Sequence, residues 1–191
     1  MRILVDQDGV LADFDAGWER DFTARWGLLA PVVGQLASRR SFKVDDQYPP
    51  SWRDAVREIS TRPGFFESLP PVPGAIVGLH ALAAAGHDVY IATAPLSTYR
   101  HCVAEKYAWV EKHLGHQWTK RVIMTKDKTL VRGDVLIDDK PHVTGSMVPA
   151  WVHVRYTRSY NADLEGVVRL TWADAAAVIA ALAADLAVAP A

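Results

Sequence analysis

Two carboxylates, Asp6 and Asp8, stand two residues apart near the start of the chain and directly follow the apolar run Ile3-Leu4-Val5. A short aliphatic run of this kind indicates a buried strand. Carboxylates at the C-terminal end of such a strand lie where open α/β sheets bind ligands, and when crowded they need a counter-charge. A divalent cation that prefers oxygen ligands would supply that charge. Taken alone, the motif fits an acidic turn without chemistry equally well.

Three later apolar runs also end in polar residues, and their types complement the first pair of carboxylates. These residues are Thr93 after residues 89–92, Lys126 and Lys128 after residues 122–124, and Asp138 and Asp139 after residues 135–137. Parallel strands bring their C-terminal ends to one edge of a sheet, so we expect all of these side chains to gather there. One carboxylate could attack phosphorus and another could move a proton, while hydroxyl and ammonium groups hold the phosphoryl oxygens. The set favours metal-assisted phosphoryl transfer.

The elements that must position these residues alternate along most of the chain. Helical patterns over residues 12–26, 74–85 and 98–114 are interleaved with the strand patterns, and residues 152–156 form one more strand. This alternation predicts a mostly parallel sheet with helices on both faces. Residues 27–73 differ, because they hold seven prolines together with Trp52, Phe65 and Phe66. We therefore predict a core of residues 1–12 and 74–191 and a small helical cap of residues 13–73.

Composition limits the classes of partner. Half of the 191 residues are apolar and the formal net charge is −1, so a sizeable core is expected and an extended nucleic-acid surface is disfavoured. The single cysteine, Cys102, excludes an internal disulfide framework and fits a reducing compartment. The chain begins with a strand and not with a leader pattern, and the alanine-rich residues 173–191 are too weakly apolar for a membrane span. We expect a cytoplasmic protein without nucleic-acid or membrane partners.

Several motifs resemble a known family. Asp6-Gln7-Asp8-Gly9-Val10, Thr93, Lys128 and Asp138-Asp139 look like the four ordered motifs of the haloacid-dehalogenase-like superfamily of phosphohydrolases. Further segments make the resemblance closest to the 5′(3′)-deoxyribonucleotidase family. They are residues 6–14, 65–67, 69–75, 105–112, 127–129 and 136–141, in the family's order across nearly the whole chain. The lysine-containing stretch of residues 106–112 and the spacing of the last two segments narrow the resemblance from superfamily to family.

The resemblance implies a fold, an activity and a set of roles. It implies a three-layer, Rossmann-like parallel-sheet core with a small helical cap inserted after the first strand. It implies Mg²⁺-dependent hydrolysis of nucleoside monophosphates through an aspartyl-phosphate, and, because relatives are dimers, a homodimer. Asp6 would be the nucleophile and a metal ligand, Asp8 the general acid/base with its carbonyl on the metal, Asp139 the third protein ligand and Asp138 its support. The phosphate would be held by Thr93, Ala94, Lys126 and Lys128, and the nucleobase pocket formed by Phe14, Phe42, Lys43, Val44, Phe66 and Lys106.

Three positions depart from the family's pattern. Ala94 stands where mammalian relatives have a serine, and Lys126 stands where they have an arginine, which replaces a bidentate fork by a point charge. Lys43 falls where a pocket tryptophan is expected, so a stacking face is lost and a cation is added. Phosphate chemistry is unaffected by these changes, but the preferred base and sugar, and the choice between 5′ and 3′ phosphates, stay open.

Three other interpretations remain. A phosphatase of the same superfamily acting on a sugar phosphate or another small metabolite is favoured by Lys43. A phospho-accepting receiver module would combine similar residues, but its acceptor should end a central strand, whereas the nearest candidate, Asp54, lies in a polar, helical stretch. A catalytically idle nucleotide-binding relative is disfavoured because no catalytic position is lost. Lys106 could also lie on a solvated helix face.

Overall fold

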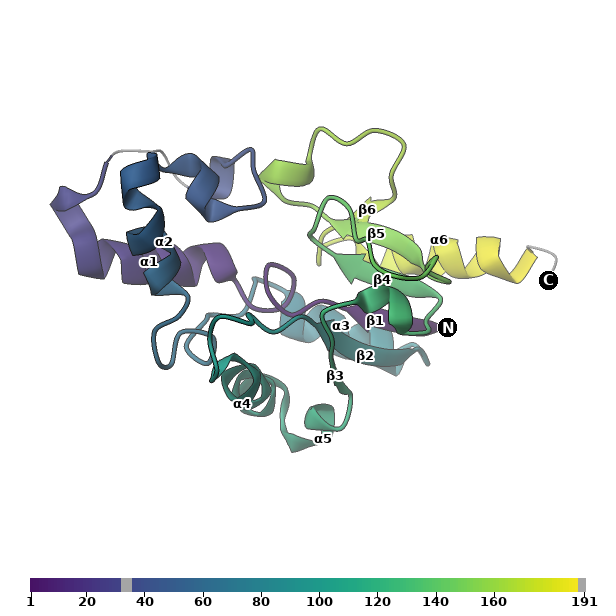
Figure 1. Ribbon diagram of the computed structural model, residues 1–191. Coiled ribbons are helices and arrows are strands. Elements are labelled where there is room, and N and C mark those ends of the chain that lie inside the picture. The colour runs from purple at the N-terminus through teal and green to yellow at the C-terminus, as the bar shows by residue number, and fades with distance from the viewer. Residues whose placement is uncertain (32–35, 189–191) are drawn as a thin grey trace.

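A parallel sheet forms the centre of the computed structural model, which describes residues 1–31 and 36–188. In these ranges the sheet has six strands in the order β3-β2-β1-β4-β5-β6 (Figure 1). The strands are β1 (Arg2–Val5), β2 (Asp88–Thr93), β3 (Val122–Met124), β4 (Val135–Asp138), β5 (Val152–Tyr156) and β6 (Arg169–Leu170). The chain runs outward from β1 on one side and then returns to β4 on the other, so β1 and β4 flank the point where open sheets bind ligands. The predicted parallel-sheet fold class is confirmed.

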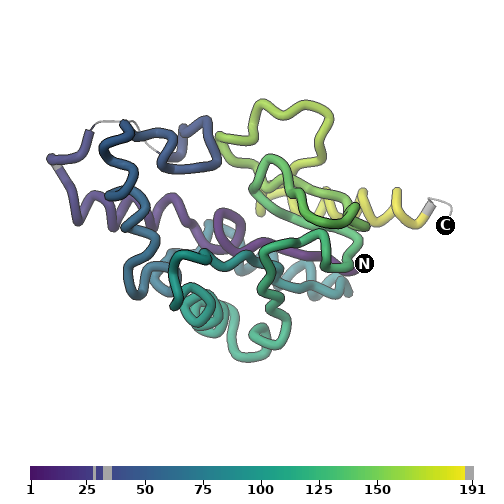
Figure 2. Tube along the Cα trace, in the orientation of Figure 1, coloured from purple at the N-terminus to yellow at the C-terminus, as the bar shows by residue number. Residues whose placement is uncertain are grey.

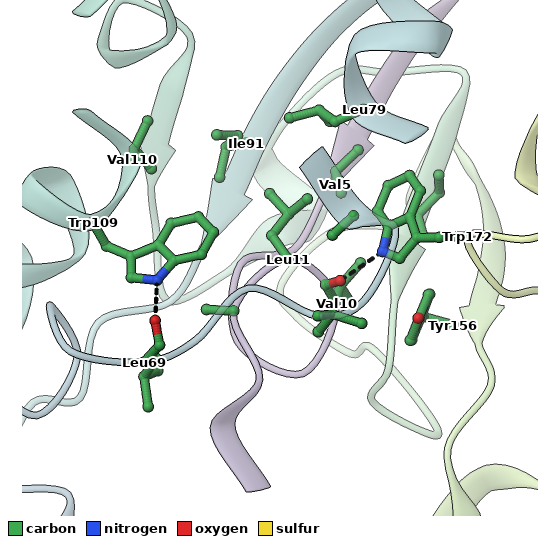
Figure 3. Packing of buried hydrophobic residues seen from close by; sticks show 14 of the residues in the cluster. Val5, Val10, Leu11, Leu69, Leu79, Ile91, Trp109, Val110, Tyr156 and Trp172 are labelled. Carbon is green, nitrogen blue, oxygen red and sulfur yellow. Dashed lines mark hydrogen bonds between the residues drawn. The ribbon is translucent and has the colours of Figure 1, made fainter. Parts of the chain in front are cut away.

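The helices pack on the face of the sheet to which Ile3 and Val5 point. α3 (Ala75–Ala84), α4 (Cys102–Leu114), α5 (His116–Thr119) and α6 (Ala175–Val188) contribute buried side chains to one large cluster with these strand residues. Figure 3 shows two indoles that fasten this cluster to the loops beside it. Nε1 of Trp109 donates to the carbonyl of Leu69 at 2.8 Å, and Nε1 of Trp172 donates to the carbonyl of Val10 at 2.8 Å. The core therefore also holds the segments that follow β1 and precede α3.

The opposite face of the sheet is covered differently. Strand residues alternate between faces, so Leu4, Ala92 and Leu136 point away from the large cluster and pack around Trp151. Within the described ranges this face carries loops and a single 3-10 turn over Lys128–Leu130, not long helices. The expectation of helices on both faces therefore holds in full for one face only. The segments that cover this face are the polar ones that follow β3 and β4.

Helices and 3-10 turns make up the segment that follows β1, as the proline-rich and aromatic composition predicts. α1 (Phe14–Trp26) and α2 (Arg53–Ile59) flank short 3-10 turns, and Asp13 caps α1 by accepting from the backbone of Ala16 at 3.2 Å. Aromatic rings form its core: Trp18 stacks on Phe22 with centroids 4.4 Å apart. This segment lies beside the C-terminal end of the sheet, as the tube in Figure 2 shows. The division into a cap of residues 13–73 and a core of residues 1–12 and 74–191 stays a prediction. Residues 32–35 of that cap and residues 189–191 of that core lie outside the described ranges.

The chain enters and leaves this segment at one place, which we call the neck, residues 11–13 and 70–72. The backbone N–H of Asp13 donates to the carbonyl of Pro70 at 2.7 Å, and that of Val72 donates to Leu11 at 2.8 Å. Leu11 and Val72 are both buried, which places the neck against the core of the sheet. The neck therefore fixes the segment directly above the end of β1.

One predicted helix begins later than expected, and one short strand was not predicted. The helix predicted over residues 98–114 begins at Cys102, because residues 96–102 instead form tight turns in which Tyr99 donates to Leu96 and Cys102 to Tyr99. β6 was not predicted, since two residues are too few for a periodic pattern. No helix within the described ranges is both long and apolar enough to cross a membrane.

Candidate active site

Three carboxylates meet where β1 and β4 end. Asp6, Asp138 and Asp139 each place one oxygen within 4.8 Å of the others. The backbone of Asp6 donates to the carbonyl of Ile137 at 2.9 Å, which continues the β1–β4 ladder and brings the strand ends into register. Burial raises the pKa of Asp6 and raises that of Asp139 well above its usual value. A set of crowded carboxylate oxygens in a buried place fits a hard divalent cation, which would favour their charged forms.

Asp139 is held in place from two sides. Gly9 has φ +75°, and a Cβ at this position would lie 2.0 Å from Oδ2 of Asp139, so the turn needs glycine for its conformation and for space. The hydroxyl of Tyr160 donates to the same oxygen, and Nδ2 of Asn161 donates to the backbone carbonyl of Asp139 at 2.8 Å. These contacts leave Asp139 little freedom to turn away from the other carboxylates.

Lys128 balances the charge of two of the three carboxylates. Its Nζ lies 2.8 Å from Oδ1 of Asp6 and 2.5 Å from Oδ2 of Asp138, and the side chain is 7% exposed. Burial lowers the pKa of Lys128, but the carboxylates of Asp138 and Asp6 together outweigh this and raise it above its usual value. The second oxygen of Asp138 accepts from the backbone of Lys140 at 2.9 Å. Lys128 is therefore a fixed cation beside Asp6.

Asp8 is paired with a different lysine. Nζ of Lys106 donates to Oδ2 of Asp8 at 2.6 Å and to Oγ1 of Thr93 at 2.8 Å, and it lies 5.2 Å from the ring centre of Phe66. Lys106 is only 1% exposed, so it does not lie on a solvated helix face. Oδ1 of Asp8 is buried and has no hydrogen-bond partner among the described residues. Burial raises the pKa of Asp8 although Lys106 opposes the shift, and a carboxyl in this state can hold and release a proton.

One cavity of about 420 Å³ joins these groups to the segment above the sheet. All of the residues predicted for the site line it, both those at the strand ends and those of the predicted base pocket. They are Asp6, Asp8, Thr93, Ala94, Lys126, Lys128, Asp138 and Asp139, with Phe14, Phe42, Lys43, Val44, Phe66 and Lys106. Their burial differs: Phe66 is buried, Phe42 is 42% exposed, and Lys43 is exposed. Lys126 is exposed as well, and its Nζ donates to the carbonyl of Pro95 at 2.9 Å.

Sequence analysis missed a buried arginine that shapes this cavity. Arg39 is 4% exposed, pairs with Asp15 at 2.9 Å and donates to the carbonyl of Phe42 at 2.7 Å. Its guanidinium lies 3.9 Å from the ring centre of Tyr160, against which Phe42 also packs edge-on at 5.6 Å. Arg39 thereby ties the Phe42 wall to the residue that holds Asp139. No local pattern marks Arg39 or Tyr160, because the side chains that they contact, Asp15 and Asp139 among them, are distant in the chain.

Comparison with known proteins places the chain in a family. The family described as "5' nucleotidase, deoxy (Pyrimidine), cytosolic type C protein" matches residues 1–186. The chain belongs to this nucleotidase family. The human cytosolic 5′(3′)-deoxyribonucleotidase is 45% identical over 169 residues, which cover 86% of this chain and 83% of the human protein. A Bordetella bronchiseptica protein classed with the 5′(3′)-deoxyribonucleotidases is 48% identical over 174 residues, covering 90% of this chain and 91% of that protein.

Solved structures of other proteins resemble this nucleotidase in fold. A haloacid dehalogenase-like hydrolase from Streptococcus pneumoniae has a TM-score of 0.57 at 11% identity, covering 93% of this chain and 97% of the other. A HAD family hydrolase from Deinococcus radiodurans was solved with bound phosphate and sodium. It has a TM-score of 0.52 at 18% identity, and the match covers 100% of this chain and 98% of the other. The predicted family, the HAD-like fold and the enzyme class, a phosphoric monoester hydrolase, are confirmed. The receiver-module interpretation is thereby dropped, and Asp54 indeed lies on an α-helix.

Proposed function

We propose that this nucleotidase is a Mg²⁺-dependent phosphomonoesterase that hydrolyses ribo- and deoxyribonucleoside monophosphates through an aspartyl-phosphate on Asp6. The observation that carries the proposal is the division of labour between Asp6 and Asp8. The first lies among the carboxylates that fit a cation, and the second is held by Lys106 beside Thr93. Both side chains face the same cavity. A nucleophile and a proton carrier are thus two residues apart on one rigid turn.

Each side chain has a task in this proposal. A carboxylate oxygen of Asp6 attacks phosphorus, and Asp8, protonated at the start, gives its proton to the leaving oxygen and later takes one from water. Thr93 and Lys128, with the backbone of Ala94 and the ammonium group of Lys126 at the rim, hold the phosphoryl oxygens while charge moves. Mg²⁺, held by Asp6, Asp139 and the Asp8 carbonyl with Asp138 in support, would neutralise charge on the phosphoryl group. Lys128 lowers the pKa of Asp6 against the larger effect of burial, and so favours its ionised, nucleophilic form.

The wall above the phosphate site supports a nucleoside as the leaving group. Phe14, Phe42, Val44 and Phe66 present apolar surface to the cavity, and flat rings stack well on such surfaces. The names of the relatives give the same substrate class for those proteins. Lys43, exposed on the same wall, favours the second candidate, a sugar phosphate or another small phosphorylated metabolite. A small substrate, no nucleic-acid polymer, no membrane partner, a homodimer and a cytoplasmic location complete the proposal.

The test is phosphate release from a panel of 5′- and 3′-monophosphates of ribo- and deoxyribonucleosides and of sugar phosphates, each with Mg²⁺. We expect nucleotides to be hydrolysed fastest. Asp6→Asn should lose nearly all turnover while its melting temperature shows a folded protein. Asp54→Asn, the same change on the exposed face of α2, should keep full activity. Turnover retained by Asp6→Asn would remove the aspartyl-phosphate, and faster hydrolysis of sugar phosphates would favour the second candidate.

A further inference from the structure

The carboxylate of Glu105, at the start of α4, is bonded to the return segment of the predicted cap. Its Oε1 accepts from the backbone N–H of Gly64 at 2.7 Å and its Oε2 accepts from that of Phe66 at 3.1 Å. The hydroxyl of Tyr99 also donates to Oε1. Glu105 is 8% exposed, so these three donors replace water around a buried charge. Nothing in the phosphate chemistry above uses this residue.

These bonds fix the ring of Phe66 as well as its backbone. Phe66 is 3% exposed and lines the cavity. The ring of Tyr99 lies almost parallel to it at 6.3 Å, and Phe65 packs edge-on at 5.1 Å. Since Tyr99 is itself bonded to Glu105, one carboxylate holds both the N–H of Phe66 and the ring behind it. The position of this wall of the cavity therefore depends on Glu105.

The next residue along α4 reaches the reaction centre. Lys106 holds Asp8 and Thr93 with its Nζ, which also lies 5.2 Å from the ring centre of Phe66. Two consecutive residues of one helix thus join the cavity wall to the proton carrier. The backbone carbonyl of Lys106 accepts from Nε2 of the buried Gln7 at 3.1 Å, which ties the helix to the turn between Asp6 and Asp8.

We propose that Glu105 and Lys106 act as one clip, in which Glu105 positions Phe66 for the substrate's ring and Lys106 positions Asp8 and Thr93 for its phosphate. Glu105 is on this proposal a positioning residue that sets the affinity for the nucleoside part of the substrate. The inference rests on the proposed nucleotidase function. It goes beyond it by separating ring binding from phosphate binding at the level of single side chains.

Glu105→Gln tests the clip, because the amide keeps the shape of the side chain but can accept at one oxygen only. One of the two backbone N–H groups then faces an NH₂ group and loses its partner. We expect the KM for a nucleoside monophosphate to rise about 10- to 100-fold, with kcat changed less than about threefold. Competitive inhibition by inorganic phosphate, which has no ring, should keep its Ki within about twofold, whereas inhibition by the free nucleoside should weaken as KM does.

Glu67→Gln is the matched control, since Glu67 is exposed and adjoins Phe66; its kinetics should equal those of the wild type. Tyr99→Phe removes one of the three hydrogen bonds to Glu105 and should raise the KM for the nucleoside monophosphate about 2- to 10-fold. This variant replaces Glu105→Gln in the test if Glu105→Gln does not fold. An equal loss of nucleoside and phosphate affinity, or no loss of either, would overturn the clip. A wild type that hydrolyses no nucleotide would instead refute the proposed function.

Discussion

Replacing Lys128 by methionine removes the fixed cation between Asp6 and Asp138. Methionine keeps the unbranched apolar stem, so the change deletes the charge and little of the packing. The ammonium group lies 2.8 Å and 2.5 Å from the two carboxylates and is almost fully buried. The variant therefore leaves carboxylates crowded in a buried place without their protein counter-charge.

The size of the effect follows from that geometry. Breaking a buried ion pair by removing one partner costs about 3–5 kcal/mol in the free energy of unfolding. For a protein of this length, 1 kcal/mol corresponds to about 2–4 °C in Tm. We therefore expect Tm of the metal-free Lys128→Met protein to fall by roughly 6–20 °C. Mg²⁺ should recover part of this loss, because it brings positive charge to the same oxygens. If Lys128 also binds the phosphate as proposed, its loss should lower kcat about 10²- to 10³-fold.

The assay is thermal unfolding with EDTA and with excess Mg²⁺, followed by initial rates on the best substrate. Lys126→Met is the control, because this lysine is exposed. The Tm of that variant should differ from that of the wild type by at most about 2 °C. A Lys128→Met protein with unchanged Tm in EDTA would refute the charge-balance reasoning. A Tm loss of the same size with and without Mg²⁺ would show that the lysine and the metal do not serve the same carboxylates.

Three further predictions concern the proposed metal ligands. Gly9→Ala forces a Cβ into Oδ2 of Asp139 at a backbone φ of +75°, so Mg²⁺ binding measured by calorimetry should be lost; unchanged affinity would contradict the close approach. Tyr160→Phe removes the donor to Asp139 but keeps the ring, and we expect Mg²⁺ affinity to fall about 10- to 100-fold with a near-normal Tm. Burial raises the pKa of Asp6 and Asp139, so both carboxyls take up protons at a higher pH than usual and a metal ion must compete with those protons. Mg²⁺ affinity should therefore fall as the pH is lowered from 7.5 to 5. A Kd independent of pH in that window would contradict the raised pKa of these two carboxyls.

The residues at the strand ends could be predicted because a parallel sheet converts sequence order into spatial proximity. Asp6, Thr93, Lys128 and Asp138 each follow an apolar run, and runs of this kind leave little choice of where the next polar side chain lies. The resemblance to the nucleotidases added the wall residues, such as Phe66. It did not indicate that the ammonium group of Lys106 donates to Asp8 and Thr93.

Glu105, Arg39 and Tyr160 could not be predicted, since each acts through a long-range contact without a periodic signal. Glu105 binds backbone groups about 40 residues away, and Tyr160 reaches Asp139 from the 3-10 turn Ser159–Asn161 after β5. Their types are unremarkable in isolation: a glutamate in a first helical turn and a tyrosine in a loop. Glu105 and Arg39 gain these contacts only when the segment after β1 packs on the sheet. Tyr160 reaches Asp139 only when the segments after β4 and β5 come together.

The neck at residues 11–13 and 70–72 has a consequence for the order in which the chain folds. β1 must pair with β2, and the contact between Arg2 and Asp88 spans 86 residues. Closing the neck first leaves two short stretches as the remaining loop, from β1 to residue 11 and from residue 72 to β2, together about 25 residues. This lowers the entropy cost of pairing the two strands by about 1 kcal/mol. The nucleus of folding is therefore expected to contain the neck, with mutations at Leu11 and Val72 slowing refolding more than they speed unfolding.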